Sequence, residues 1–136
     1  EYFASGEGIA RQAAEYLKKH ERYQGDLRKG PGAKVTTHDV FAAREKGDVA
    51  ASAIIDLAVE YWGMAAANLV SLFNPEKIIF GGGVFGPAVE LIPAIYQEAE
   101  KWAQPISIRQ VSFEPSALGG DAGVYGAGYL AMKQIG

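Results

Sequence analysis

The sequence predicts a helix-rich α/β fold that contains one short parallel β-α-β unit. Two short apolar segments, residues 78–80 and 106–111, have the length and composition of strands. An amphipathic helical pattern over 87–103 joins them, and such a crossover makes the two strands parallel and the connection right-handed. Helical patterns account for most of the remaining chain, so that residues 1–73 are mostly helical and 74–136 form a β-α-β-α unit.

The predicted sheet is too small to be stable alone. Isolated two-stranded sheets are marginal in water, and parallel sheets are normally covered on both faces. The chain also begins on a helical pattern with no strand before it. We therefore expect the other strands of the sheet upstream of residue 1, in a longer protein of which this chain is the C-terminal part.

Composition excludes several classes of function. The net charge of −3 argues against a nucleic-acid surface, which needs concentrated Lys and Arg. The chain has no cysteine, so it holds no disulfide and no cysteine-ligated metal, and its two histidines, His20 and His38, are too isolated for a metal site. No uninterrupted apolar run approaches the ~20 residues of a membrane span. These features are compatible with a cytoplasmic protein.

The first half of the chain is predicted to form three helices. Apolar residues at helical spacing indicate a helix over 5–20, with Ser5 as its N-cap. A polar, glycine-rich loop separates it from the second helix. Thr36 and Asp39 have the spacing of a capping box, which predicts a short helix over 37–46.

The third helix, from Asp48 to Phe73, is the longest predicted element. Its apolar residues recur at i, i+3 and i+4, and at 1.5 Å per residue it spans roughly 38 Å. Gly63 and the alanines at 65–67 keep its middle thin, so another backbone can pack closely there. Its exposed apolar faces predict a homo-oligomer.

The second half begins with the strand at 78–80, which we expect to be buried. The chain then passes through three glycines into a helix that starts near Pro87. Pro87 suits the first turn of a helix, whereas Pro93 lies inside the pattern and predicts a kink or a break. After the second strand, Asp121 is expected to cap a last helix.

The glycines Gly81, Gly82 and Gly83 are the main candidate site. Glycine has no Cβ and tolerates positive φ, so backbone N–H groups there can approach a ligand closely. A strand that ends in bare backbone before a helix N-terminus suits a phosphate or a ribose. A single glycine would suffice for a tight turn, and three in succession favour a ligand site over a purely structural turn.

The same glycines also match a dinucleotide-binding fingerprint, because Gly81, Gly83 and Gly86 have the G-x-G-x-x-G spacing. Glu114 could be the acidic residue that binds the ribose of NAD. Against this alternative, the fingerprint normally opens a domain with several further β-α units, and Glu114 comes later than the usual ~20 residues. A P-loop is excluded, since no Lys-Ser or Lys-Thr follows the glycines.

Four segments of the chain stand out together: EYFASG at 1–6, the stretch 36–48, NPEKIIFGGGV at 74–84 and ALGGDAGVYGA at 117–127. In this order they resemble the C-terminal half of the ROK family, which comprises bacterial sugar kinases, glucokinases among them, and sugar-responsive repressors. The resemblance covers essentially the whole chain.

The resemblance implies an actin-like ATPase (ribonuclease H-like) fold, in which two lobes close over ATP and a hexose. Gly81, Gly82 and Gly83 would then line the nucleotide pocket on the adenosine side, and Glu1 would accept hydrogen bonds from sugar hydroxyls. The implied activity is transfer of the γ-phosphoryl group of ATP to a hexose with Mg²⁺. A ROK transcriptional repressor, with its DNA-binding part upstream, is the alternative.

The resemblance also shows what this chain lacks. The family's phosphate loop, its aspartate base and the ligands of its zinc motif have no counterpart in residues 1–136. We therefore assign no catalytic residue and no metal ligand to this segment, and any zinc would be bound outside it. Phosphoryl transfer depends on the missing groups. The isolated segment is accordingly predicted to be inactive as a kinase.

Overall fold

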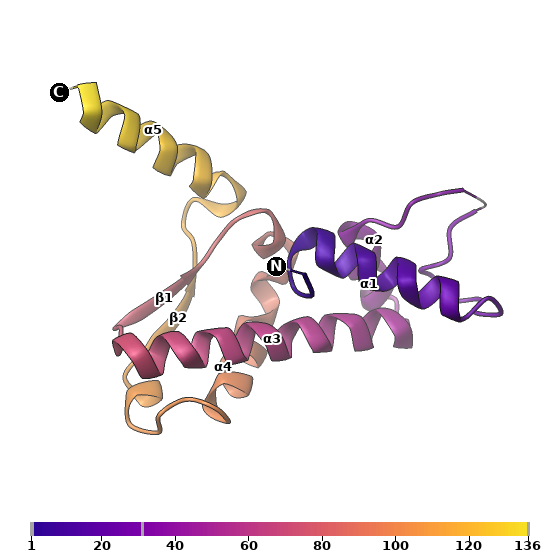
Figure 1. The fold of residues 1–136 in the computed structure, drawn as a ribbon, viewed down its shortest axis with the longest axis horizontal. Helices are drawn as coiled ribbons and strands as arrows, with labels where there is room; N and C mark the ends of the chain where they lie inside the picture. The colour runs from indigo at the N-terminus through magenta and orange to yellow at the C-terminus, as the bar shows by residue number, and fades with distance from the viewer. Residues whose placement is uncertain (1, 31, 136) are drawn as a thin grey trace.

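The computed structural model describes residues 2–30 and 32–135 (Figure 1). Within them, helices surround one central helix, and a small sheet lies at one side. The helices are α1 (Gly6–Lys19), α2 (Thr37–Glu45), α3 (Val49–Phe73), α4 (Ile92–Glu100) and α5 (Ala122–Ile135), and the strands are β1 (Lys77–Phe80) and β2 (Ser112–Pro115). Short 3-10 helices lie at Gly83–Phe85, Pro87–Leu91, Ser107–Arg109 and Gly119–Asp121.

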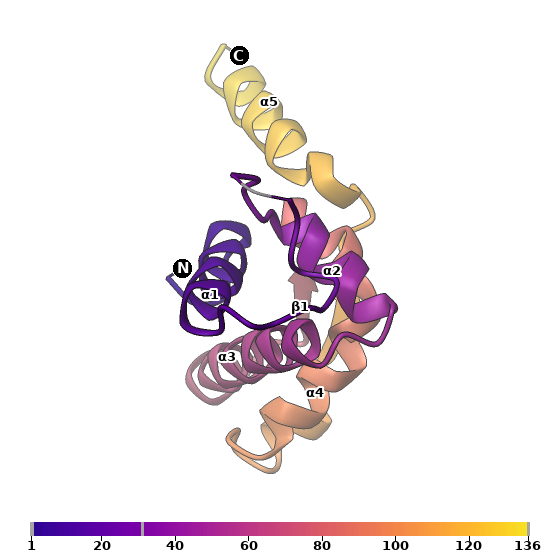
Figure 2. The same ribbon diagram turned by 90° about the vertical axis from the view of Figure 1, so that its right-hand side faces the viewer.

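Helix α3 is the centre of the structure. Helices α1 and α2 pack against its first half and α4 packs along it, as Figures 1 and 2 show. It is long and apolar enough to cross a membrane by length and composition alone. Its apolar composition is also explained by packing, because its side chains contribute to both clusters of buried hydrophobic residues in the described structure. The largest fully buried side chains are Ile9, Leu27, Val40, Ile55, Val70 and Ile95.

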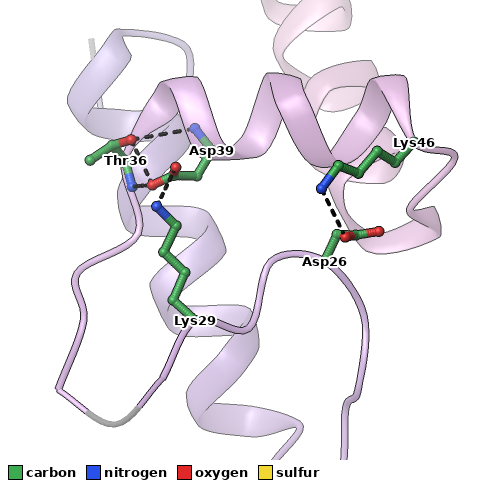
Figure 3. Close-up of polar contacts among 5 residues, drawn as sticks. All are labelled: Asp26, Lys29, Thr36, Asp39 and Lys46. Atoms are coloured by element: carbon green, nitrogen blue, oxygen red, sulfur yellow. Dashed lines mark hydrogen bonds and ion pairs between the residues drawn. The ribbon is translucent and has the colours of Figure 1, made fainter.

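Side-chain caps define where the first helices begin. The Ser5 hydroxyl accepts a hydrogen bond from the Gly8 N–H at the start of α1. Thr36 and Asp39 form the predicted capping box at the start of α2, drawn in Figure 3. The figure also shows the Lys29 ammonium on the Asp39 carboxylate. The expected helices over 5–20 and 37–46 are confirmed to within a residue at each end.

Asp48 caps α3 and also anchors the loop before α2. Its Oδ1 accepts from the Ala51 N–H at 2.9 Å, and its Oδ2 accepts from the Asp26 N–H at 2.8 Å and from the Tyr23 hydroxyl. Burial raises the pKa of Asp48, but the hydrogen bonds from Tyr23, Ala51 and Asp26 outweigh it and lower the pKa overall. Burial, followed by the bond to Asp48, raises the pKa of Tyr23 to about 12. The long loop is therefore tied to the central helix.

The sheet is parallel, as predicted, with β1 beside β2. Its register runs from Lys77 opposite Ser112 to Phe80 opposite Pro115. Ile78, Phe80 and Phe113 pack against the cluster formed with α3 and α4. The expectation of a buried strand is wrong: Ile78 and Phe80 are only partly buried, and on the other face Ile79 is 64% exposed because no described element covers it.

Two further expectations need correction. The predicted strand at 106–111 is a 3-10 turn, Ser107–Arg109, and the strand lies next to it at Ser112–Pro115. The cause is local, since the side-chain oxygen of Gln104 accepts from the N–H groups of Ile106 and Ser107 at 2.8 and 2.7 Å. These bonds cap a helical turn.

The predicted helix at 87–103 is also divided. Residues Pro87–Leu91 form a 3-10 helix, and α4 begins only at Ile92. Pro93 accordingly lies in the first turn of α4, where its missing N–H costs no helical hydrogen bond. The break that Pro93 predicted is confirmed.

Helix α5 points away from the rest of the molecule (Figure 1). Among the described elements its main contact is with the turn Gly119–Asp121, directly before it. Several of its large apolar side chains are exposed, namely Val124, Tyr125, Tyr129, Leu130 and Met132. An apolar helix with so little cover is typical of an element that packs against another part of a larger structure.

Candidate functional site

The three candidate glycines lie at the carboxyl end of β1 and differ in what they require. A Cβ on Gly81 would come within 3.1 Å of the Ser116 Cβ, so close packing with β2's end favours glycine there. Gly82 has φ of +91°, a conformation that side chains rarely adopt. A Cβ on Gly83 would meet nothing within 4 Å. At Gly82 and Gly83 the backbone therefore faces open space.

A pair of glycines, Gly119 and Gly120, follows the carboxyl end of β2, close to the three glycines that follow β1. The Ser116 N–H donates to the Phe80 carbonyl at 2.7 Å, which continues the sheet past both strands. Gly119, with φ of +54°, begins the turn Gly119–Asp121, and this turn contacts the turn Gly83–Phe85. Ligands of open α/β sheets bind at this edge, outside the carboxyl ends of the strands.

The backbone after the glycines differs from the expected helix. The turn at Gly83–Phe85 and the 3-10 helix at Pro87–Leu91 precede α4, which begins nine residues after Gly83. The positive end of a helix dipole acts only within its first turn. The expected contribution of a helix N-terminus to anion binding is therefore wrong for Gly81–Gly83, and exposed backbone alone remains.

This geometry also removes support from the NAD alternative. Its fingerprint requires glycines that lead directly into an α-helix, which the turns after Gly83 do not provide. Glu114, the candidate ribose ligand, forms an ion pair with Lys77 at 2.8 Å on the bare face of the sheet. The hydrogen bond from Lys77, followed by the one from Ser112, lowers the pKa of Glu114. The hydrogen bond between Lys77 and Glu114 also raises the pKa of Lys77.

The predicted sugar ligand, Glu1, lies outside the described residues. The residues that follow it border an open hollow of about 750 Å³, lined by Tyr2, Ser5, Gly6, Glu7 and Arg11. The Arg11 guanidinium lies 4.1 Å from the centre of the Tyr2 ring. The hollow combines polar, charged and aromatic groups, a mixture that suits a hydroxyl-rich ligand.

The two candidate regions meet at one contact. A Cβ built on Gly6 would lie 3.4 Å from the Val84 Cγ2, so the start of α1 touches the turn that follows the three glycines. Gly6 is further fixed by the Thr37 hydroxyl, which donates to its carbonyl oxygen. The segment after Glu1 and the glycine turn are therefore neighbours, although 78 positions separate Gly6 and Val84 in the sequence.

Metal binding has no visible basis in this part of the chain. Across residues 2–30 and 32–135, no three His, Cys, Asp or Glu side chains gather closely enough to hold a metal ion. Sequence reasoning considered Gly119 and Gly120 either as near the nucleotide or as residues that shape their turn, and it missed the Gly6–Val84 contact. That contact joins distant segments, and the sequence carried no local signal for it.

The chain belongs to the ROK family, whose model matches residues 1–134. It is 39% identical over 134 residues to a glucokinase of Halalkalibacterium halodurans, an alignment that covers 98% of this chain and 41% of that relative. The match confirms the resemblance found in the four sequence segments. The chain thus spans about two fifths of the length of the curated relative.

Solved structures of the family share the fold. A ROK family glucokinase from Streptomyces griseus, solved in complex with glucose and AMPPNP, matches with a TM-score of 0.77 and 27% identity over 96% of this chain and 43% of its own. A ROK family transcriptional regulator, a homologue of the Escherichia coli MLC protein, matches with a TM-score of 0.69 and 26% identity over 84% of this chain and 28% of its own. Both kinases and regulators are therefore among its structural relatives.

Proposed function

We propose that this chain is the C-terminal part of an ATP-dependent sugar kinase that transfers the γ-phosphoryl group of ATP to a hexose, as in a glucokinase. The observation that carries the proposal is the open backbone at Gly82 and Gly83, next to the segment that follows Glu1. The proposal draws further support from the relative named glucokinase and from the relative solved with glucose and AMPPNP.

In this proposal each region has a limited role. The N–H groups and bare surface of Gly82 and Gly83 admit the nucleotide, because no side chain occupies the space in front of them. Glu1 accepts hydrogen bonds from sugar hydroxyls. The Gly6–Val84 contact keeps the two binding regions side by side. ATP supplies the phosphoryl group, and Mg²⁺, with ligands outside this segment, neutralises its charge.

The test is a coupled assay of glucose phosphorylation with the full-length protein to which we assign this segment. We expect ATP-dependent formation of glucose 6-phosphate. The segment of residues 1–136, assayed alone, should show no rate above the background. The absence of hexose phosphorylation by the full-length protein, tested with several hexoses, would refute the kinase proposal.

The second candidate is the sugar-sensing half of a ROK repressor. It is favoured by the regulator structure and by 30% identity over 95 residues to the N-acetylglucosamine repressor of E. coli strains. The two candidates differ in a direct measurement. A repressor would bind operator DNA in a sugar-dependent way and would leave ATP unchanged, whereas a kinase would consume ATP.

A further inference from the structure

Trp62 lies between the two candidate binding regions and contacts both. Its indole N–H donates to the carbonyl oxygen of Ala4 at 3.0 Å, across 58 positions of sequence. Its ring packs on the Phe85 ring, with centroids 5.1 Å apart and the planes tilted by 51°. The side chain comes from the middle of α3, the most firmly packed helix, so both contacts start from a fixed position.

The first contact leads to the sugar region. Ala4 lies three residues after Glu1 and directly before Ser5, which lines the hollow next to the predicted sugar ligand. The Phe3 ring stacks on the Tyr61 ring with centroids 5.1 Å apart, which holds the segment around Ala4 against α3. The bond from Trp62 therefore sets the distance of this segment from the helix.

The second contact leads to the nucleotide region. The Phe85 N–H donates to the Gly82 carbonyl at 3.0 Å, and the Phe85 ring packs on Phe80 at the end of β1, 5.0 Å away. A shift of the Phe85 ring would therefore change the backbone of the glycine turn. Trp62 is thus linked to the glycine turn through its contact with the Phe85 ring.

We propose that Trp62 is a positioning residue that couples hexose binding to nucleotide binding in this protein. The inference rests on the proposed function. A ligand that fixes one region fixes the other through the indole, so that each ligand binds more tightly in the presence of the other, and by the same factor in both directions. The separate Gly6–Val84 contact involves one methyl group and no hydrogen bond, so it constrains the relative position of the two regions less than Trp62 does.

The experiment measures the glucose Kd of the full-length protein with and without AMPPNP, and the AMPPNP Kd with and without glucose. Trp62→Phe keeps a ring against Phe85 but removes the N–H that bonds Ala4. We expect cooperative binding in the unchanged protein, and a cooperativity factor lowered about fivefold in Trp62→Phe. Each Kd measured alone should change by less than about twofold. A loss of packing alone would instead weaken both ligands and leave the factor unchanged.

Trp102→Phe is the matched control, because Trp102 is 56% exposed and its indole N–H bonds the Glu98 carboxylate of α4, away from the site. It should leave the cooperativity factor unchanged. Phe85→Leu, which breaks the other end of the connection, should lower the factor as Trp62→Phe does, and it replaces that variant if the latter does not fold. Cooperativity that is absent in the unchanged protein, or intact in the folded variants, overturns the inference. Failure of the unchanged protein to bind either ligand would refute the proposed function itself.

Discussion

At the scale of single residues, Gly82 and Gly83 should differ in how much a substitution by alanine changes stability. Gly82 has φ of +91° and ψ of 174°, an extended conformation that only glycine adopts readily, so Gly82→Ala should lower the free energy of unfolding by about 1–3 kcal/mol. Gly83 has open space where its Cβ would be, so Gly83→Ala should change stability by less than about 0.5 kcal/mol. Urea unfolding of the two variants measures the contrast.

Gly83→Ala is then the cleaner probe of the site. In the full-length protein a methyl group in front of the turn should raise the Kd for AMPPNP about fivefold, the equivalent of one lost hydrogen bond. The glucose Kd without nucleotide should stay unchanged. An unaltered AMPPNP Kd in a folded Gly83→Ala protein would contradict a nucleotide site at this turn.

Asp39 makes stability depend on acid pH. The Lys29 ammonium, and then the Thr36 hydroxyl and N–H, lower the pKa of Asp39 from its ordinary value of 3.8 to about 2. Because the pKa is lower in the folded state, the ionised carboxylate stabilises the fold above about pH 4. That contribution is lost as the pH falls from about 4 to 2, where the folded protein is also protonated.

Asp39→Asn tests this contribution. The variant keeps the size of the side chain but loses its charge, and we expect it to be less stable by about 1 kcal/mol at pH 7. The difference from the unchanged protein should shrink toward pH 2, as followed by thermal unfolding. Asp56→Asn, on the exposed face of α3, is the control, with little expected effect. A pH-independent difference would contradict the role assigned to ionised Asp39.

At the scale of elements, the close approach of α3 and α4 depends on Gly63. A Cβ there would lie 2.6 Å from the Glu98 Cβ and Cγ and 3.1 Å from the Ala99 nitrogen. These atoms belong to the base of a side chain and to the backbone, so they cannot move aside cheaply. Gly63→Ala should therefore destabilise the protein by about 1–3 kcal/mol, although alanine favours helix by about 1 kcal/mol.

Gly128 in α5 is the matched control for Gly63. It is also in a helix, but a Cβ there would meet nothing within 4 Å. Gly128→Ala should therefore stabilise α5 by up to about 1 kcal/mol through helix propensity alone. Circular dichroism during thermal unfolding measures both variants. A stabilised Gly63→Ala protein would contradict the packing of α3 against α4.

The same scale shows where sequence reasoning was sufficient. Helices α1 to α3 were predictable because their caps and periodicity are local, as at Ser5 and Asp48. The second strand was misplaced because the alternation at 106–111 belongs to a turn capped by Gln104, and strand pairing is a non-local choice. The glycines Gly81–Gly83 were identifiable, but the contact between Gly6 and Val84 depends on the packing of α1 against distant turns.

At the scale of the whole molecule, several apolar surfaces lack a partner in the described residues. They are the outer face of the sheet at Ile79, most of α5, and a stripe along α3 that contains Tyr61, Leu69 and Leu72. Two of the chain's relatives, the glucokinases of Halalkalibacterium halodurans and Streptomyces griseus, are more than twice as long as this chain. The expectation of further strands upstream, drawn from the small sheet and the helical start of the chain, stays a prediction.

The stripe of α3 has a shape that suits a second copy of the chain. At helical spacing, Ile54 and Ala58 are buried under the first two helices, whereas Leu69 and Leu72 continue the same face uncovered. Tyr61, between the two parts, is partly covered by the Phe3 ring. The centre of the bare part is thin, at Ala65. If two copies of α3 cross antiparallel at Ala65, Tyr61 of each copy would face Leu69 and Leu72 of the other. Such a reciprocal contact is what an isologous dimer requires.

The exposed apolar area lies at the lower end of the range that such a dimer needs. Six exposed side chains on and beside the stripe contribute about 600 Å² per copy, if a large apolar side chain has roughly 200 Å². A standard interface uses about 800 Å² per partner. The six are Tyr2, Phe3, Tyr61, Leu69, Leu72 and Phe73.

We therefore predict that the protein forms a dimer through α3, and that the double variant Leu69→Glu, Leu72→Glu is monomeric. Two carboxylates on each copy would place four like charges in a desolvated interface, where unpaired charge is costly. Val49→Glu is the control, because Val49 is equally apolar and 82% exposed but lies at the start of α3, away from the stripe. Sedimentation velocity should show a dimer for the unchanged protein and for Val49→Glu. If the unchanged protein sediments as a monomer across a wide concentration range, the stripe serves another contact within the longer chain.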